Sequence, residues 1–120
     1  MTTKKFDLEE RTTVFSENII DLCKKTPKNS ITLSILDQLE RSGTSIGANY
    51  FEANGASTRK DFVNKIYICK KESKETQYWL RLLSKAYQEV SDQCGRLWQE
   101  ANELTKIFAA IAINSKVKPI

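Results

Sequence analysis

Hydrophobic residues recur along the chain at intervals of three, four and seven positions, in four segments separated by short breaks. This spacing is typical of helices that bury one face against a core. It predicts helices over about residues 6–24, 30–53, 58–86 and 92–113, with caps at residue 29 or 30, 57 or 58, and 91 or 92. The side chains expected to face inward are Leu8, Phe15, Ile19, Leu22, Ile35, Leu39, Ile46, Tyr50, Ala53, Phe62, Ile66, Cys69, Leu80, Leu83, Leu97, Ala101, Leu104, Phe108 and Ile111.

The breaks between the segments are short. Proline disfavours helix in the preceding residue, so Thr26-Pro27 ends the first segment, and Asn54-Gly55 predicts a left-handed end to the second. Four long helices with short connections predict an all-α, antiparallel, up-down-up-down four-helix bundle. A chain of 120 residues suits a single domain, residues 1–120, with an ordered core over about residues 6–114.

Two glycines interrupt the second helix. Gly43 and Gly47 each cost a helix about 1 kcal/mol relative to alanine, so we expect close approach of a neighbouring helix there. A polar row follows the same helix at steps of four, four and three residues, and consists of Arg41, Ser45, Asn49 and Glu52.

The third helix carries more apolar surface than one seam requires. Beside its inward stripe lies a second stripe that mixes large apolar groups with two carboxylates: Ile68, Glu72, Glu75, Trp79 and Leu82. Such a face is a candidate for contact between subunits, with Ile68, Trp79 and Leu82 as the interface residues. The alternative is a wider core within one bundle.

A third face of the same helix is basic. Five cations interleaved with two tyrosines face away from the inward stripe: Lys60, Tyr67, Lys71, Lys74, Tyr78, Arg81 and Lys85. Cations bind phosphates, and tyrosines stack on unpaired bases, so these residues are a candidate RNA or DNA interface. The alternative is the solvated charged face that every bundle helix has.

Composition limits the chemistry. The chain has no histidine, which removes the commonest general base and transition-metal ligand, and it has no Gly-rich phosphate loop. We therefore expect no catalytic residues, no cofactor and no metal. Cys23, Cys69 and Cys94 are widely spaced without a CxxC pair, which predicts buried, reduced thiols.

Charge and hydropathy indicate a cytoplasmic protein that does not contact membranes. The first seven residues lack the apolar segment of a signal peptide, and the longest apolar run, residues 107–113, is too short to span a bilayer. The net charge of +4 and the pI of about 9.0 suit nucleic acid or an acidic protein surface.

Two ordered motifs on consecutive helices resemble one protein family. The first reads Arg41-Ser42-x-x-Ser45-Ile46-x-Ala48-Asn49-x-x-Glu52; after Asp61-Phe62, the second reads Lys71-Glu72-x-x-Glu75-Thr76-x-Tyr78-Trp79-Leu80. Over roughly residues 6–114 the chain is similar to the four-helix-bundle proteins encoded within intervening sequences of bacterial 23S ribosomal RNA genes. The family pattern Asn-Ile-Ala-Glu-Gly reads Asn49-Tyr50-Phe51-Glu52-Ala53 here, with the glycine displaced to Gly55.

The resemblance implies a small cytosolic bundle, often a homopentamer, without established enzymatic activity. More distantly, the chain is similar to the accessory protein of diversity-generating retroelements, a basic pentamer that works with a nucleic-acid enzyme, the reverse transcriptase. The family motif falls on Arg41, Ser42, Ser45, Asn49, Glu52, Glu72 and Glu75.

These motif residues predict a polar network. Antiparallel packing brings Arg41 closest to Glu72 or Glu75, and Ser45 and Asn49 would complete a partly buried cluster that fixes helix register or subunit geometry. Loss of Arg41 should then destabilise the fold by about 3 kcal/mol or more. The alternative is a solvated polar face.

Three functions follow from these patterns. We expect a non-catalytic oligomeric bundle that associates with RNA through its basic face; the alternative is a protein interaction scaffold that binds no nucleic acid. A third possibility rests on Glu72, Glu75, Glu89 and Asp92, whose spacing resembles the acidic motifs of all-helical, magnesium-dependent nucleotide pyrophosphohydrolases.

Overall fold

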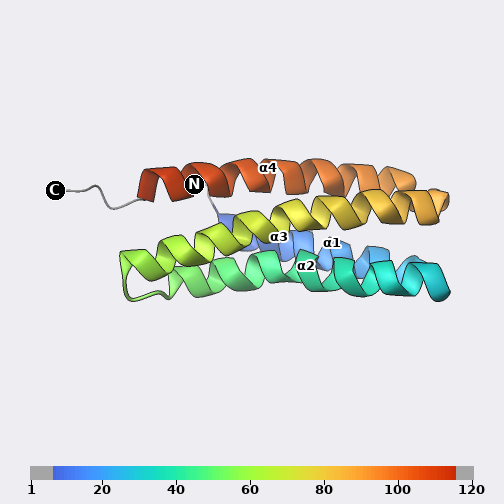
Figure 1. Ribbon diagram of the computed structural model, residues 1–120, viewed down its shortest axis with the longest axis horizontal. Coiled ribbons are helices and arrows are strands. Elements are labelled where there is room, and N and C mark those ends of the chain that lie inside the picture. The colour runs from blue at the N-terminus through green and yellow to red at the C-terminus, as the bar shows by residue number, and fades with distance from the viewer. Residues whose placement is uncertain (1–6, 116–120) are drawn as a thin grey trace.

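The computed structural model describes residues 7–115 and contains four long helices. They are α1 (Leu8–Lys25), α2 (Ser30–Asn54), α3 (Arg59–Ala86) and α4 (Ser91–Ser115), with a 3-10 turn, η2 (Gln88–Val90), leading into α4. Figure 1 shows the helices side by side along the long axis of a body measuring 54 × 32 × 20 Å. Residues 7–115 include no strand, and the predicted four-helix bundle is confirmed.

Side-chain caps fix where three helices begin. Asp7 accepts a hydrogen bond from the Glu10 N–H, and the Thr58 hydroxyl accepts one from the Asp61 N–H. Asn29 forms a full capping box with Thr32, in which each side chain accepts from the other residue's backbone N–H. These interactions satisfy N–H groups that have no partner in the first helical turn.

Two predicted helix ends differ from the structure. Gly55 has φ −95°, so the predicted left-handed end is wrong. The N–H groups of Gly55 and Ala56 bond to the carbonyls three residues back, so the chain leaves α2 through tightened right-handed turns. Ser91 is the first residue of α4 and not its cap, because η2 runs directly into the helix.

The core contains the predicted inward-facing stripes, and also Leu36, Val90, Cys94 and Ala112, which were not among them. Nearly all of the predicted side chains are buried, and the other four, Ile35, Tyr50, Phe62 and Ile111, are partly buried and pack against the core. Tyr50 contacts Phe108 of α4, with ring centroids 5.8 Å apart. None of the described helices combines the length and apolarity needed to cross a bilayer.

Gly43 and Gly47 allow α1 to approach α2 closely, as predicted. A Cβ atom on Gly43 would lie 2.9 Å from Cγ1 of Ile19, and one on Gly47 would lie 3.4 Å from Thr12. By contrast, α1 and α4 approach each other less closely than the other neighbouring pairs. The bundle is therefore tight along α1–α2, α2–α3 and α3–α4 and more open along α1–α4.

Candidate nucleic-acid interface

The predicted basic residues form one continuous stripe on α3. All seven are exposed, and they follow one another at steps of seven, four, three, four, three and four residues: Lys60, Tyr67, Lys71, Lys74, Tyr78, Arg81 and Lys85. At 3.6 residues per turn, this basic stripe lies opposite the seven buried residues of the helix. It extends about 37 Å from Lys60 to Lys85 at 1.5 Å per residue.

The charge of the chain is concentrated on this helix. α3 contains eight Lys or Arg residues and three Asp or Glu residues, a net charge of +5, whereas the whole chain has +4. The three acids of α3 lie off the basic stripe. None of the five cations of the stripe forms an ion pair with a residue in the range 7–115. Their charges are therefore available to an anionic partner of the monomer.

The two tyrosines present ring surface beside these cations. Tyr67 is 41% exposed and Tyr78 is 56% exposed. The Tyr78 ring packs against Trp79 at a centroid distance of 4.9 Å and an interplanar angle of 76°. This edge-to-face contact holds Tyr78 in place while more than half of the residue stays in solvent.

The basic stripe ends in a hollow lined by hydrogen-bond donors. Its lining consists of Arg81, Ser84, Lys85, Gln88 and Ser91, around a volume of about 490 Å³. Neither an acidic nor an apolar side chain is part of the lining. Two cations, two hydroxyls and an amide match the hydrogen-bonding needs of a phosphate group.

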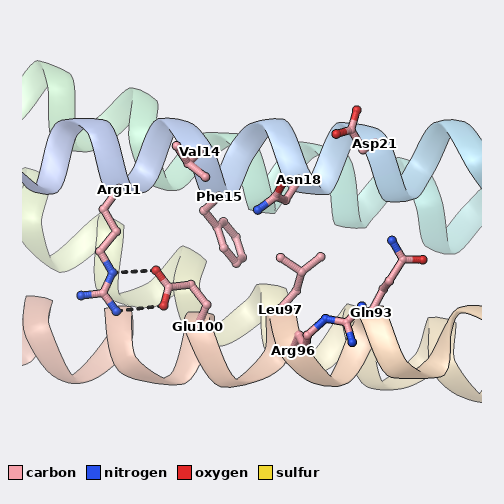
Figure 2. A pocket seen from close by; sticks show the side chains of 9 residues that line it. All are labelled: Arg11, Val14, Phe15, Asn18, Asp21, Gln93, Arg96, Leu97 and Glu100. Atoms are coloured by element: carbon pink, nitrogen blue, oxygen red, sulfur yellow. Dashed lines mark hydrogen bonds and ion pairs between the residues drawn. The ribbon is translucent and has the colours of Figure 1, made fainter.

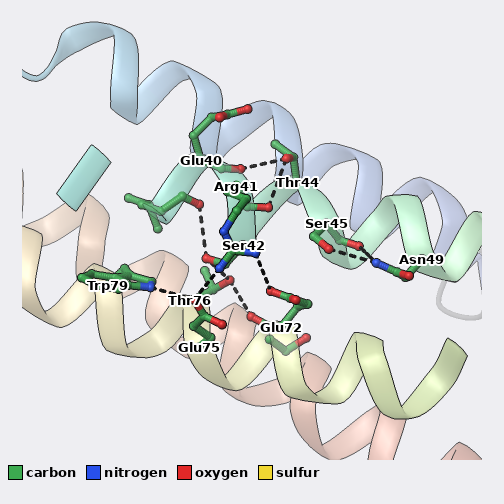
Figure 3. Close-up of polar contacts among 12 residues, drawn as sticks. Glu40, Arg41, Ser42, Thr44, Ser45, Asn49, Glu72, Glu75, Thr76 and Trp79 are labelled. Atoms are coloured by element: carbon green, nitrogen blue, oxygen red, sulfur yellow. Dashed lines mark hydrogen bonds and ion pairs between the residues drawn. The ribbon is translucent and has the colours of Figure 1, made fainter. Parts of the chain in front are cut away.

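The carboxylates of Glu72 and Glu75 on α3 point toward Arg41 of α2, as Figure 3 shows. Arg41 Nη2 lies 2.5 Å from Glu75 Oε2, and Nη1 lies 3.6 Å from Glu72 Oε1. Trp79 Nε1 donates to the same Glu75 oxygen at 3.1 Å. The predicted pairing of Arg41 thus occurs with both carboxylates, and Trp79 joins it.

Burial is unequal across this cluster. The Glu72 side chain is only 9% exposed, and its Oε1 accepts no hydrogen bond from any described residue, whereas the Arg41 side chain is 51% exposed. Water can replace much of what an exposed guanidinium supplies. Loss of Arg41 should therefore cost less than the 3 kcal/mol that the sequence led us to expect.

The rest of the predicted polar network divides into separate pairs. Asn49 Nδ2 donates to Ser45 Oγ at 2.9 Å, within α2. Glu52 pairs with Lys65 of α3 at 2.6 Å. Among the described residues, these pairs have no hydrogen bond to Glu72 or Glu75, so the predicted single network is wrong in extent. Intrahelical bonds satisfy Ser45 and Asn49 without the carboxylates.

The predicted interface residues lie along the α2–α3 side of α3. Ile68, Trp79 and Leu82 are each partly buried. Trp79 packs against the core, as the wider-core alternative required, whereas Ile68 and Leu82 lie outside the core cluster. The edge formed by Ile68, Trp79 and Leu82 therefore contributes Trp79 to the packing of the bundle and leaves part of its apolar surface in solvent.

Residues 4–110 match the family described as 23S rRNA-intervening sequence protein. This chain belongs to that family. A similar solved structure is the crystal structure of a protein of unknown function from the S23 ribosomal protein family of Bacteroides thetaiotaomicron. It is 33% identical, the match covers 87% of this chain and 96% of that one, and the TM-score is 0.77. A comparison with curated proteins found no match.

In this 23S rRNA-intervening sequence protein, the motif residues contact one another or their neighbours within the bundle. Ser42 is fully buried and accepts a hydrogen bond from the Thr76 hydroxyl at 3.1 Å. Sequence reasoning missed Thr76 and Lys65 as partners. A small polar residue such as Ser42 beside the apolar stripe of α2 is a signal for such an interior pair, because buried hydroxyls need partners.

A second surface hollow lies between α1 and α4 (Figure 2) and encloses about 600 Å³. Phe15 and Leu97 point into it, and Arg11 and Glu100 join the two helices at one side. Arg11 bonds Glu100 through two hydrogen bonds of 2.6 and 2.8 Å and also bonds Glu103. The Glu100 hydrogen bond is the main cause of a raised pKa of the Arg11 guanidinium. Charges of both signs line this hollow, so it favours no class of ligand.

The acids of the pyrophosphohydrolase alternative lie apart. Glu75 is bound by Arg41 and Trp79, whereas Glu89 accepts from the Tyr87 hydroxyl beyond the end of α3. Eleven helical residues, about 16 Å, separate Glu75 from Ala86 at that end. Within residues 7–115, no three His, Cys, Asp or Glu side chains are grouped to hold a metal ion.

The cysteines are free thiols. Cys69 and Cys94 are buried, Cys23 is partly buried, and none of them forms a disulfide. Burial raises the pKa of the Cys69 thiol to about 12 and those of Cys23 and Cys94 to about 11. These groups therefore remain protonated and unreactive at neutral pH.

Proposed function

We propose that this protein is a non-catalytic, self-associating helical bundle that binds RNA through the basic stripe of α3. The observation that carries the proposal is the charge distribution: α3 has a net charge of +5 in a chain of +4. Five of its cations stand in one exposed row, and they have no acidic partner among residues 7–115. Neutralising phosphates is the main source of affinity in nonspecific nucleic-acid binding.

The surroundings of the basic stripe support the same function. At its Lys85 end, the stripe continues into the hollow lined by hydrogen-bond donors, beside Ser84 and Ser91. Phosphates can be contacted along the row and within the hollow without rearranging the bundle. RNA binding then requires no residue that holds the fold together.

The number of cations in the basic stripe predicts how strongly RNA affinity depends on salt concentration. If five cations each neutralise one phosphate of a single strand, the logarithm of affinity falls with a slope of about −3.5 against the logarithm of salt concentration. Between 50 and 200 mM salt, affinity should therefore fall about 100-fold.

The test is a fluorescence anisotropy titration of a labelled RNA fragment containing both stems and loops. We expect Lys71→Glu/Lys74→Glu/Arg81→Glu to abolish binding at 50 mM salt. The matched control is Lys24→Glu/Lys25→Glu/Lys106→Glu, which changes three exposed cations on α1 and α4. Both variants change the net charge from +4 to −2, so only the position of the charge differs. Equal affinities of the two variants would refute the role of the stripe.

Self-association is the second part of the proposal. We place the contact on the edge formed by Ile68, Trp79 and Leu82, because Ile68 and Leu82 are partly exposed apolar residues outside the core cluster. The expected assembly is a pentamer, as the family resemblance implies. Five chains of 13.7 kDa give about 69 kDa by light scattering.

The control for this edge is an apolar residue on another surface. Ile68→Glu/Leu82→Glu should lower the mass to that of one chain, whereas Val14→Glu, in the α1–α4 hollow, should leave it unchanged. A wild-type mass of 13.7 kDa contradicts self-association. A pentamer that does not bind RNA would instead favour a scaffold for protein contacts alone.

A further inference from the structure

Resting on the proposed function, we infer that the basic stripe selects unpaired RNA, with bases stacked on Tyr67 and Tyr78 and phosphates on the cations between and beyond them. Each tyrosine has a cation one turn away: Lys71 follows Tyr67 by four residues, and Lys74 precedes Tyr78 by four. Exposed tyrosines placed among cations are the combination that proteins use to bind single strands without sequence preference.

The spacing of the rings suits one strand with several bases. Tyr67 and Tyr78 are eleven residues apart, about 16 Å along the helix axis. This distance is about five times the 3.4 Å rise between stacked bases of a strand, so the rings serve different bases. Lys71 and Lys74 lie between the rings, where the connecting phosphates pass.

A duplex fits the same surface poorly. The stripe is nearly straight over about 37 Å, whereas each strand of a duplex curves away from a straight line within one helical turn. Paired bases also stack on one another and offer no open face to Tyr67 or Tyr78, and the deep, narrow major groove of an RNA duplex excludes side chains. A flexible single strand can follow the whole row.

The tyrosines have the exposure that stacking requires. Tyr78 is 56% exposed, and its contact with Trp79 limits its motion, so less order must be gained on binding. By contrast Phe51, which is 70% exposed, borders a hollow lined by Asp7, Glu9 and Glu10, where a phosphate backbone would be repelled. Phe51 is therefore a matched control for the loss of an exposed aromatic ring.

The experiment compares a labelled 20-nucleotide single-stranded RNA with the duplex of the same sequence, by anisotropy at 50 mM salt with the full chain. We expect the single strand to bind at least about 10-fold more tightly. Tyr67→Ala/Tyr78→Ala should weaken single-strand binding by about 25-fold or more, from about 5-fold for each lost stack. Tyr67→Phe/Tyr78→Phe and Phe51→Ala should bind like the wild type. Tyr67→Ala alone leaves the Tyr78–Trp79 contact intact and should still cost about 5-fold.

The outcomes separate this inference from the proposed function. Equal affinity for single strand and duplex, or an unchanged affinity of the double alanine variant, overturns the inference and leaves phosphate binding by the stripe intact. No binding of either probe, with wild-type protein shown to be folded by circular dichroism, overturns the proposed function and the inference with it.

Discussion

The glycines of the bundle provide a direct test of how closely its helices approach. Gly43 and Gly95 both lie inside helices, so replacing either with alanine should gain about 1 kcal/mol of helix propensity. At Gly95 an added Cβ meets nothing within 4 Å, so the gain should appear in full. At Gly43 it lies 2.9 and 3.1 Å from Cγ1 and Cγ2 of Ile19, a fully buried, β-branched side chain that cannot easily rotate away.

Overpacking of this kind costs about 1–3 kcal/mol, which offsets or exceeds the propensity gain. We therefore expect Gly43→Ala to lower the free energy of unfolding by up to about 2 kcal/mol, and Gly95→Ala to raise it by about 1 kcal/mol. For 120 residues, 1 kcal/mol corresponds to a shift in Tm of about 4 °C. Thermal melting by circular dichroism, at one protein concentration, measures both.

A double-mutant cycle isolates the contact. Ile19→Ala alone should cost about 2–5 kcal/mol by leaving a cavity. In that background the atoms facing Gly43 are gone, so Gly43→Ala should stabilise by about 1 kcal/mol, as Gly95→Ala does. If Gly43→Ala melts as high as Gly95→Ala in the wild-type background, the inferred close approach of α1 and α2 at this position is wrong.

Three further predictions concern charge. Arg41→Ala should cost about 1–2 kcal/mol by urea unfolding, because it leaves the buried Glu72 without a cation, and adding Glu72→Gln should recover part of that loss. Arg11→Ala should cost about 1 kcal/mol and speed hydrogen exchange in α1, since it removes the two-point bond to Glu100, whereas Arg96→Ala, in the same hollow, should have no effect. Stability should also fall above about pH 9, because the unfolded thiols ionise while the buried thiols of the folded protein stay protonated; Cys69 alone contributes about 1.4 kcal/mol per pH unit up to about pH 12, so Cys69→Ala should make the total fall shallower.

Much of this fold could be predicted because the hydrophobic pattern of the sequence is periodic. The inward stripes, the close helix approach at Gly43 and Gly47, and the facing of Arg41 with Glu72 and Glu75 all follow from helical spacing and antiparallel register. Once a few apolar pairs align two antiparallel helices, that alignment also determines which polar residues face each other across the contact.

Other features depend on competition that spacing does not reveal. The predicted network extended to Asn49, but the Asn49 side chain donates within its own helix to the Ser45 hydroxyl and carbonyl at 2.9 Å. The bond between Arg11 and Glu100 joins residues 89 positions apart across the most open side of the bundle. The end of α2 is likewise decided by hydrogen bonds of 3.1 Å three residues back, which remove the need for positive φ at Gly55.

The polar cluster of the family motif and the basic stripe are physically connected. Arg41 binds Glu75, Glu75 accepts from Trp79 Nε1, and the Trp79 ring packs against Tyr78. α2 therefore positions a residue of the proposed RNA surface through three consecutive contacts.

If Tyr78 stacks on a base, this chain of contacts supplies its rigidity, and the role of Arg41 is distinct from that of the stripe cations. A cation of the stripe acts on phosphates and changes the salt dependence of binding, whereas Arg41 acts on the orientation of a ring and changes the preference for unpaired bases. The presence of Arg41 in the family motif is then explained by its place in this chain of contacts, although its charge is paired with Glu72 and Glu75 and does not bind phosphate.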